Sequence, residues 1–390
     1  MLKEGREKIT PLEVPDWIQE AMLKEQAPWY AHVAFHTWLL LGAGGLFLLA
    51  VFLVALLPFP AGKEQNALET SPPKIEATPV NQPAQEEQTV RLSITSTPSG
   101  AAVYLKLETL QETGAFKVRG AANKLRNLTP AEQARGVVTV STGNHGRAVA
   151  YVARQLGLKA TVCLSERVPP NKVEALQRLE AEVVIHGQSQ DEAEARARQI
   201  QAERGAIMVP PFDDPFIIAG QGTIGLELLA ALPDIDTALV PLSGGGLIAG
   251  IALALKTANP AIRVIGLSMA RAPVMYHSLQ AGRPVQMPEE PTLADSLQGG
   301  IGLDNQYTFQ LVREYVDEVI LLSEEEIAGG MAYAFFEHHL VLEGAGAVGI
   351  AGLLHRKISK LGRNVALVLS GGNVELRSFL QIVQKEEIGD

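Results

Sequence analysis

The sequence predicts an α/β protein with two lobes, each built around a mostly parallel sheet. Short apolar runs typical of strands alternate with longer amphipathic segments typical of helices, which indicates βαβ units. The alternation occurs in two series. The first contains the runs VVTVS, ATVCL and AEVVIHG, and the second contains ALVPL, RVIGLS and NVALVLS. Two such series in one chain predict two lobes with a cleft between them.

The composition argues against several classes of protein. The chain has 390 residues, enough for two ordinary domains with extra segments. Its formal net charge of −10 argues against a nucleic-acid partner, because phosphate binding requires a basic face. A single cysteine, Cys163, rules out a disulfide framework and a zinc site with Cys-pair spacing. It lies in an apolar run and is expected to be a small core residue.

The N-terminal part has a different character. Residues 1–36 carry mixed charges and are expected to lie in the cytoplasm or at a membrane surface. Residues 37–57 are apolar and uncharged, and at ~1.5 Å per residue a helix of this length crosses the roughly 30 Å hydrocarbon layer. We expect a single transmembrane helix. A signal peptide is less favoured, because Pro58, Phe59 and Pro60 follow instead of a small-residue cleavage site.

Two further segments precede the α/β region. Residues 58–90 are rich in Pro, Glu, Gln, Asn and Thr, and we expect a disordered linker because they cannot bury enough apolar surface. Residues 91–103 alternate in polarity around a Pro-Ser-Gly turn, which predicts a β-hairpin. This hairpin resembles the opening of a PEGA-type β-domain. Residues 104–385 then contain both α/β series, with the smaller lobe expected at about 136–214.

A candidate Schiff-base lysine lies in the segment GAFKVRGA. Phe116 and Lys117 stand between small residues at a strand-to-helix transition. Small neighbours let a flat cofactor lie against the backbone, and Phe116 can pack beside it. For a lone lysine, an ordinary solvated residue near a helix start would be the simpler reading. Lys117 is a candidate nucleophile and base.

A candidate substrate loop follows the strand VVTVS and precedes a helix expected to begin near Ala148. Backbone N–H groups at a helix N-terminus bind anions, here a substrate carboxylate. An ordinary helix cap is the alternative for such a loop. The candidate substrate residues are Ser141, Thr142, Gly143, Asn144 and His145, of which Thr142 offers a hydroxyl beside the reacting carbon.

Two glycine-containing turns also follow strands. The run Ser243, Gly244, Gly245, Gly246 and Leu247 follows ALVPL and opens a helix, so its N–H groups and the helix dipole are suited to a phosphate. A glycine-rich turn without a ligand is the alternative. The spacing is neither that of a Rossmann fingerprint nor that of a P-loop. A second turn begins at Ser370, after the strand VALVLS.

These four motifs, in this order, resemble those of the serine/threonine dehydratases, which are fold type II pyridoxal-phosphate (PLP) enzymes with a tryptophan synthase β-like fold. The resemblance covers residues 103–385. It is closest to the hydroxyectoine-utilisation dehydratases in the stretches VSTGNHGRAVAYVARQLG, VPPFDD and LADSLQGGIGLDN. It implies a lyase of amino acid catabolism that eliminates water from a β-hydroxy amino acid, such as threonine, serine or a hydroxyectoine product, to give a 2-oxo acid and ammonia.

The resemblance also implies roles for individual residues. Lys117 holds PLP as a Schiff base and removes the α-proton, while Thr142 acts beside the reacting carbon. Asn144 donates to the phenolic oxygen of the ring and Ser370 faces the pyridine nitrogen. Residues 343–347 resemble the glutamate-containing loop near the cofactor. The implied cofactor-binding residues are Phe116, Lys117, Asn144, Ser243, Gly244, Gly245, Gly246, Leu247 and Ser370.

The chain departs from the family at three positions. Thr142 replaces the usual second serine of its loop and keeps a hydroxyl. Ser243 replaces the first of four glycines. Ser268 stands where metal-dependent members carry an acid, so we expect no divalent metal there. The chain ends soon after the turn at Ser370, and we expect no C-terminal regulatory domain.

Two alternatives remain open. One is a PLP-dependent β-replacement enzyme of the cysteine synthase type, although such enzymes carry Ser-Gly-Asn-Thr where this chain has His145 after Asn144. The other is an inactive membrane-anchored fusion, because residues 37–103 replace family residues that normally precede YLKLE. More Lys and Arg residues precede the predicted span than follow it closely, which favours placing the C-terminal part outside the cell. PLP chemistry favours the cytoplasm, and we expect the catalytic region there. The oligomeric state is open, and a homodimer is compatible with the sequence.

Overall fold

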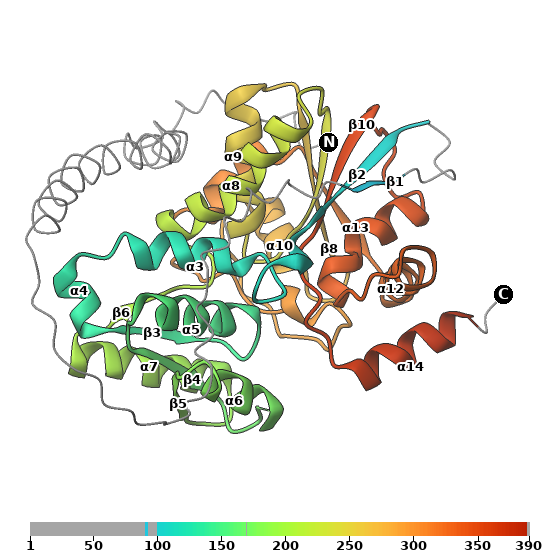
Figure 1. Ribbon diagram of the computed structural model, residues 1–390. Coiled ribbons are helices and arrows are strands. Elements are labelled where there is room, and N and C mark those ends of the chain that lie inside the picture. Colours follow the sequence, from blue (N-terminus) through green and yellow to red (C-terminus); the bar gives the residue numbers. More distant parts are fainter. Residues whose placement is uncertain (1–89, 93–99, 169, 388–390) are drawn as a thin grey trace, which may run out of the picture. The chain divides into compact units, whose positions relative to one another are not determined.

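A computed structural model of the chain describes residues 90–92, 100–168 and 170–387, and Figure 1 labels many of its elements. The expected segments 1–36 and 37–57, and the expected linker except its last residue, lie outside these residues. Of the helices in the described ranges, none is long and apolar enough to cross a bilayer.

The larger of two sheets contains the first described strand, β1, and strands from the second half of the chain. Within the described residues its strands are, in spatial order, β1 (Val90–Leu92), β2 (Ala102–Leu107), β10 (Asn364–Leu369), β7 (Thr237–Pro241), β8 (Arg263–Met269) and β9 (Glu318–Leu322). From β2 to β9 all pairs are parallel. This agrees with the expected βαβ units, since parallel neighbours need a crossover connection.

The strands β1 and β2 are neighbours in the larger sheet. They pair antiparallel, with Val90 opposite Leu105 and Leu92 opposite Val103. The second strand also pairs in parallel with β10 along its whole length, across the expected border between residues 103 and 104. Because Val103 and Leu105 are fully buried in the core of the larger sheet, β2 is a structural strand of that sheet.

Helices cover both faces of the larger sheet (Figure 1). In β10, Val365, Leu367 and Leu369 belong to one apolar cluster, whereas Ala366 and Val368 belong to another. The alternation follows from the period of two in a strand, and both faces are apolar because both are covered. The first cluster includes residues of α12 (Glu324–His338), α13 (Gly344–Leu354) and α14 (Leu376–Glu387), and the second residues of α8 (Pro215–Ala231), α9 (Gly246–Ala258), α10 (Val274–Ala281) and α11 (Thr308–Tyr315).

The smaller sheet is parallel throughout. Its described strands are, in spatial order, β5 (Glu182–Ile185), β4 (Ala160–Leu164), β3 (Val137–Val140) and β6 (Ile207–Met208). They span residues 137–208, within the range expected for the smaller lobe. On β4, Val162 and Leu164 face one cluster, and Cys163 faces the other as a buried core residue.

Helices of the smaller lobe and short connecting elements complete the described fold. They are η1 (Glu108–Leu110), α3 (Lys117–Arg126), α4 (Pro130–Arg135), α5 (Asn144–Leu156), α6 (Pro170–Gln177), α7 (Gln190–Arg204) and η2 (Asp295–Leu297). In Figure 1 the small sheet and helices α5 to α7 are drawn in green.

One helix begins earlier than the sequence suggests. We expected a start near Ala148, but α5 begins at Asn144. Gly146 is therefore helical, although glycine disfavours helices and the local sequence predicted a loop at this position. Its presence has a packing reason, because a Cβ atom at Gly146 would lie 2.3 Å from the Ser141 carbonyl oxygen. The early start puts Asn144 and His145 in the first helical turn.

Candidate active site

The motifs found in the sequence lie at the carboxyl ends of strands, where ligands bind in open α/β sheets. The STGNH loop (residues 141–145) follows β3, the SGGG loop (residues 243–246) follows β7, and the SGGN loop (residues 370–373) follows β10. Lys117 is the first residue of α3. Hydrogen bonds among these segments show which of them meet.

The lysine segment is attached to the SGGN loop. The Phe116 amide donates to the Ser370 carbonyl oxygen at 3.0 Å, and Ala115 forms an isolated β-bridge with Gly371. The ammonium of Lys117 donates to the Pro211 carbonyl oxygen at 2.7 Å and lies 5.2 Å from the centroid of the Phe116 ring. Lys117 is thus held between the end of β10 and the segment that leads into α8.

Burial moves the charges of this site toward neutrality. It lowers the pKa of Lys117 from 10.5 to about 8, against the opposing field of Glu343. It also raises the pKa of Glu343 from 4.5 to about 7, although a hydrogen bond from Asn144 favours the carboxylate. The site therefore contains an amine and a carboxyl group that both change protonation near neutral pH, which is typical of active sites.

Asn144 joins the two lobes. Its Nδ2 donates to both carboxylate oxygens of Glu343, at 2.9 and 3.1 Å, and its Oδ1 accepts from Asn373 at 2.8 Å. Asn373 also donates to the Thr113 carbonyl oxygen at 2.7 Å and accepts from Arg147 at 2.9 Å. We call Asn144, Arg147, Glu343 and Asn373 the inter-lobe network. The asparagine expected to meet the cofactor ring is here bonded to protein groups.

His145 is a structural part of the STGNH loop. Its side chain is buried, and Nε2 donates to the Val209 carbonyl oxygen at 2.9 Å. Burial and the nearby Lys117 charge lower the pKa of His145 to about 3, so the ring is neutral. The other ring nitrogen, Nδ1, has no hydrogen-bond partner among the described residues.

The rest of the STGNH loop presents backbone groups. The Ser141 hydroxyl accepts from the Gly143 amide at 3.2 Å. Gly143 is the N-cap residue of α5, and in the described region no side chain caps that helix. The start of α5 therefore presents uncapped N–H groups, which suit an anion.

The glycines of the SGGG loop are required by a close contact with Phe212. A Cβ atom at Gly244 would lie 2.4 Å from the Phe212 ring, and one at Gly246 would lie 2.9 Å from the Phe212 Cα. Gly245, at φ +91°, is the N-cap of α9 and brings no capping side chain. The Ser243 hydroxyl donates to the Leu297 carbonyl oxygen at 2.8 Å, so the loop offers a phosphate mainly its backbone N–H groups.

Ser370 is a buried serine with a weakly engaged hydroxyl. It is 3% exposed, and its Oγ lies 3.5 Å from the Ala345 carbonyl oxygen, at the limit of hydrogen bonding. A hydroxyl held this loosely can turn toward another partner. The Leu247 side chain is buried in the first turn of α9, so that it can contribute to a phosphate site through its backbone only.

Three groups of the site were given no role from the sequence, although Glu343 belongs to the loop 343–347 that resembles the family's glutamate-containing loop. They are the Glu343 carboxyl group, Asn373 and the Pro211 carbonyl oxygen. The glycine-rich pattern after Glu343 was a signal for the first, because it indicates a close backbone approach. A Cβ atom at Gly346 would lie 2.4 Å from the Gly371 carbonyl oxygen. Nothing local distinguishes Asn373 or Pro211, whose partners lie in distant segments.

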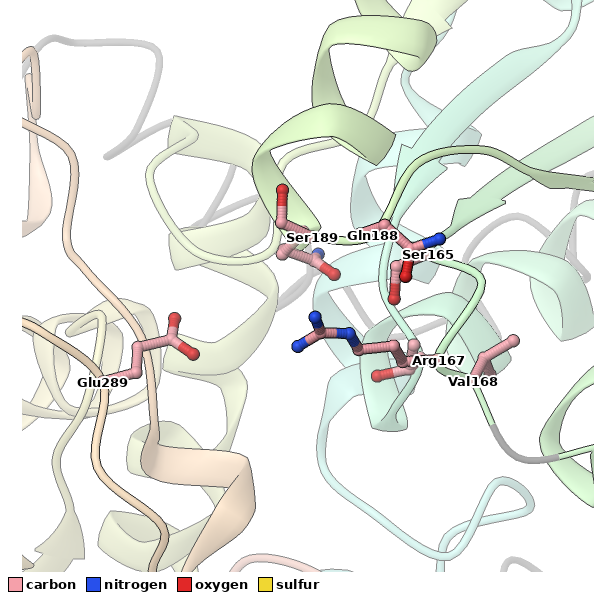
Figure 2. Close-up of a pocket in the computed structure, with 8 residues that line it drawn as sticks. Ser165, Arg167, Val168, Gln188, Ser189 and Glu289 are labelled. Carbon is pink, nitrogen blue, oxygen red and sulfur yellow. The ribbon is translucent and has the colours of Figure 1, made fainter.

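Thr142 lines a pocket between the lobes, drawn in Figure 2, with a volume of about 350 Å³. The pocket is lined by Thr142, Ser165, Arg167, Val168, Gln188, Ser189, Gln190 and Glu289. Ser268 stands where metal-dependent members of the family carry an acid. Its side chain is buried, and its hydroxyl lies 3.5 Å from the Met269 sulfur. The described ranges contain no cluster of three His, Cys, Asp or Glu side chains suited to a metal ion.

Comparison with known protein families gives one match that covers most of the chain. Residues 76–371 match the family described as "Pyridoxal-phosphate dependent enzyme". A putative threonine dehydratase from Sinorhizobium fredii is 48% identical over 303 residues, which cover 76% of this chain and 91% of the relative. An L-threonine ammonia-lyase from Geobacter sulfurreducens is 47% identical over 286 residues, which cover 73% of this chain and 71% of the relative.

Solved structures show the same fold. Maize serine racemase superposes with a TM-score of 0.71 at 34% identity, over 77% of this chain and 92% of the racemase. Threonine deaminase isoform 2 from Solanum lycopersicum superposes with a TM-score of 0.68 at 34% identity, over 73% of this chain and 83% of the deaminase. The two sheets, parallel except for the pair of β1 with β2, and their helices are therefore a fold type II arrangement.

Proposed function

Because this chain belongs to the family of PLP-dependent enzymes, we propose that it deaminates a β-hydroxy amino acid by eliminating water, giving a 2-oxo acid and ammonia. It is a lyase of the threonine dehydratase type, and its cofactor is PLP. The observation that carries the proposal is the Lys117 amine with its lowered pKa, held between the SGGN loop and the Pro211 carbonyl.

The residues of the site fit PLP. The Lys117 amine is neutral in a substantial fraction near pH 8 and can attack an aldehyde. Gly244, Gly245 and Gly246 of the SGGG loop carry no side chains, so the loop would meet the phosphate with its backbone, and a Cβ atom at Gly244 would collide with the Phe212 ring. Its uncapped helix α9 suits the phosphate. Phe116 would lie beside the ring and Ser370 would bond the pyridine nitrogen.

The bound cofactor supplies an electron-withdrawing ring that makes the α-proton of an amino acid acidic. The protein's own groups do the remaining work. The N–H groups at the start of α5 bind the substrate carboxylate. The Lys117 amine takes the α-proton, which its lowered pKa permits near neutral pH. The neutral hydroxyl of Ser370 does not hold the pyridine nitrogen protonated as a carboxylate would, which favours elimination over transamination.

Asn144 has a second task in this proposal. To donate to the cofactor ring, Nδ2 must leave at least one oxygen of Glu343. A protonated Glu343 can accept less from Asn144, and its pKa of about 7 makes that form available at neutral pH. Thr142 would place its hydroxyl at the reacting carbon, where a β-hydroxyl leaves.

We further propose that the substrate is threonine, serine or a related β-hydroxy amino acid, including one derived from hydroxyectoine. The stretches VSTGNHGRAVAYVARQLG, VPPFDD and LADSLQGGIGLDN support the narrower hydroxyectoine group. The named relatives are threonine dehydratases and L-threonine ammonia-lyases, which supports threonine.

The test is an assay of the reconstituted holoenzyme. Formation of 2-oxo acid from L-threonine and L-serine is followed with a coupled dehydrogenase, and O-acetylserine with sulfide serves as the β-replacement substrate. We expect 2-oxo acid from the hydroxy amino acids, and a loss of about 10²–10⁴-fold in Lys117→Ala. Borohydride reduction followed by peptide mass analysis should place the cofactor on Lys117. Cysteine formation without 2-oxo acid would contradict the proposal, and absence of any Lys117 adduct would favour the inactive fusion.

We also propose that residues 37–57 anchor the protein in a membrane with the catalytic region in the cytoplasm. The uncharged apolar run supports the anchor, and the cytoplasmic supply of PLP supports the orientation. Protease added to intact cells should leave a C-terminal tag intact. We propose in addition that residues 91–103 form a PEGA-like hairpin and that the protein is a homodimer. Light scattering of detergent-solubilised protein tests the dimer.

A further inference from the structure

The carboxyl group of Glu343 is held between the two lobes. Glu343 is the N-cap residue of α13, and its side chain is 4% exposed. In the described region it does not bond the first turn of its own helix, where N–H groups would stabilise a carboxylate. Its oxygens instead accept from Nδ2 of Asn144, on α5 of the smaller lobe. A Cβ atom at Gly371 would lie 2.7 Å from Glu343 Oε1, so the carboxyl group also packs against the SGGN loop.

The side-chain amide of Asn144 is engaged on both of its ends. An asparagine side chain donates from Nδ2 and accepts at Oδ1. Nδ2 donates to the Glu343 oxygens at 2.9 and 3.1 Å, and Oδ1 accepts from Asn373 at 2.8 Å. An ionised carboxyl group only accepts, so a turned amide would place Oδ1 against a negative charge. While Glu343 is ionised, Nδ2 of Asn144 therefore stays on Glu343.

A proton on Glu343 changes this arrangement. The protonated carboxyl group has an O–H donor and fewer acceptor sites. It also binds the amide less strongly, because hydrogen bonds to ionised groups are roughly twice as strong as those between neutral groups. An N–H of Asn144 is then released for the phenolic oxygen of PLP. Burial raises the pKa of Glu343 from 4.5 to about 7, so this change takes place near neutral pH.

We propose that Glu343 is a positioning residue that controls cofactor binding through Asn144: PLP binds most tightly when Glu343 carries a proton, and binding to the ionised form takes up one proton from solvent. This inference rests on the proposed function, in which Asn144 donates to the cofactor ring, and it adds a pH dependence of cofactor loading.

Other charges also act on Glu343. The charged groups around it, from η2, α6, α3 and α5, are Asp295, Lys172, Lys117 and, through Asn373, Arg147. Asp295 disfavours the carboxylate and Lys172 favours it, so burial remains the main cause of the raised pKa. All four groups are present in the wild type and in the Glu343 variant used below. Their own titration therefore cancels when the affinities of the two proteins are compared at each pH.

The first experiment measures cofactor affinity without the reaction of the lysine. Pyridoxine 5′-phosphate keeps the ring oxygen and the phosphate but lacks the aldehyde that Lys117 attacks. It is titrated into the full-length apoprotein, and fluorescence gives Kd for the wild type and for Glu343→Gln, whose side chain has the shape of the protonated acid. We expect the ratio of wild-type Kd to variant Kd to rise about 10-fold from pH 6 to pH 8, because one proton is linked to binding.

The matched control is Glu337→Gln, an exposed glutamate of α12 in the same lobe. It should keep the pH dependence of the wild type. Asn144→Ala should bind the ligand more weakly and lose this pH dependence, because the proton on Glu343 then has no amide to release. A wild-type pH dependence in Asn144→Ala would overturn the inference, since it would show that Glu343 acts without Asn144.

The second experiment counts protons and requires no stable variant. Calorimetry of the same binding reaction, in buffers that differ in their enthalpy of ionisation, gives the number of protons taken up. The wild type should take up about one proton more at pH 8 than at pH 6, where Glu343 is already protonated. Glu343→Gln should not show this difference. Equal uptake by the two proteins at pH 8 would mean that Glu343 is not the group that gains the proton.

The outcomes separate this inference from the proposed function. If 2-oxo acid forms from threonine but the ratio of the two Kd values is the same at pH 6 and pH 8, the role of Glu343 is wrong and the proposed function stands. If no hydroxy amino acid is deaminated but Glu343→Gln removes the pH dependence of ligand binding, the role of Glu343 stands and the proposed function fails.

Discussion

Lys117 and Glu343 show what burial does to single residues of this site. One is a base and the other an acid, and desolvation favours the neutral form of each. Both groups then exchange protons near neutral pH, where a lyase of this type needs a base that can be released and regenerated. Burial also lowers the pKa of His145, but to about 3, so this ring does not exchange a proton at neutral pH.

The raised pKa of Glu343 predicts a pH dependence of stability. Between pH 4.5 and about 7 the unfolded chain loses this proton while the folded protein retains it, so the free energy of unfolding falls as pH rises through this window. A shift of this size corresponds to roughly 3 kcal/mol at 1.36 kcal/mol per pKa unit. Glu343→Gln should remove this dependence in the apoprotein, as measured by urea unfolding at several pH values. A Glu343→Gln curve parallel to that of the wild type would contradict the prediction.

At the scale of elements, a buried ion-pair cluster fixes the helix that carries Lys117. Arg119, two residues after Lys117 in α3, donates to Glu108 of η1 at 2.8 and 3.0 Å and to Glu227 of α8 at 2.5 and 2.7 Å. Lys106 of β2 also pairs with Glu227. Three elements from distant parts of the sequence thereby share one guanidinium, and the start of α3 is held against the larger sheet.

Removing this guanidinium should be costly. Arg119→Met leaves Glu108, which is only 1% exposed, without its cationic partner. We expect a loss of about 3–5 kcal/mol in the free energy of unfolding, the usual cost of breaking one half of a buried pair. Arg198→Met, which breaks an exposed pair with Glu194 within α7, should cost less than about 1 kcal/mol. Urea unfolding of both variants measures the two losses of unfolding free energy. Equal losses would show that the cluster stabilises the fold no more than an exposed ion pair does.

The contact between the SGGG loop and Phe212 gives a second prediction for an element. In Gly246→Ala the new Cβ would lie 2.9 Å from the Phe212 Cα and 3.0 Å from its carbonyl oxygen, so backbone must move. We expect a loss of about 1–3 kcal/mol in stability, together with weaker PLP binding. Gly300→Ala is the control, because the nearest atom to its Cβ is 4.0 Å away. Thermal unfolding and fluorescence titration with PLP measure the two effects, and unchanged PLP affinity in Gly246→Ala would argue against a phosphate site at this loop.

At the scale of the whole described region, the inter-lobe network connects α5 of the smaller lobe to the ends of β10 and α13. Asn373 is central to it, because it bonds both Asn144 and Arg147 while its Nδ2 also binds the Thr113 carbonyl oxygen. Bonds that join two lobes bias the equilibrium between the relative positions of the lobes.

Asn373→Ala should loosen this connection without unfolding either lobe. We expect faster hydrogen–deuterium exchange at the start of α5, with unchanged exchange in the strands of the larger sheet. The control is Asn127→Ala, since Asn127 bonds only Asn123 among the described residues. Uniformly faster exchange across both sheets in Asn373→Ala would mean that the residue supports global stability instead.

Much of the strand pattern was predictable because it depends on local periodicity. The buried strands β4, β7, β8 and β10 are apolar runs bounded by polar residues, and each was recognised. The β2 strand was recognised as half of a hairpin, but its role in the larger sheet was not, because pairing with β10 joins residues far apart in the sequence. The early start of α5 was missed because a helical glycine at position 146 is explained only by the neighbouring Ser141 carbonyl.

The sequence by itself determined the residue types and the order of the motifs: a lysine before a helix, a hydroxyl- and amide-bearing loop, a glycine turn and a final serine, each after an apolar strand. Those features are local, since strand and helix signals and loop chemistry extend over a few residues. Only the tertiary structure decided how the motifs meet. In that structure Lys117 donates a hydrogen bond to the Pro211 carbonyl oxygen, Asn144 donates to Glu343, and Phe212 packs against the glycine turn. The lowered pKa of Lys117 is also tertiary in origin, because burial by distant segments removes the water that would otherwise stabilise its charge.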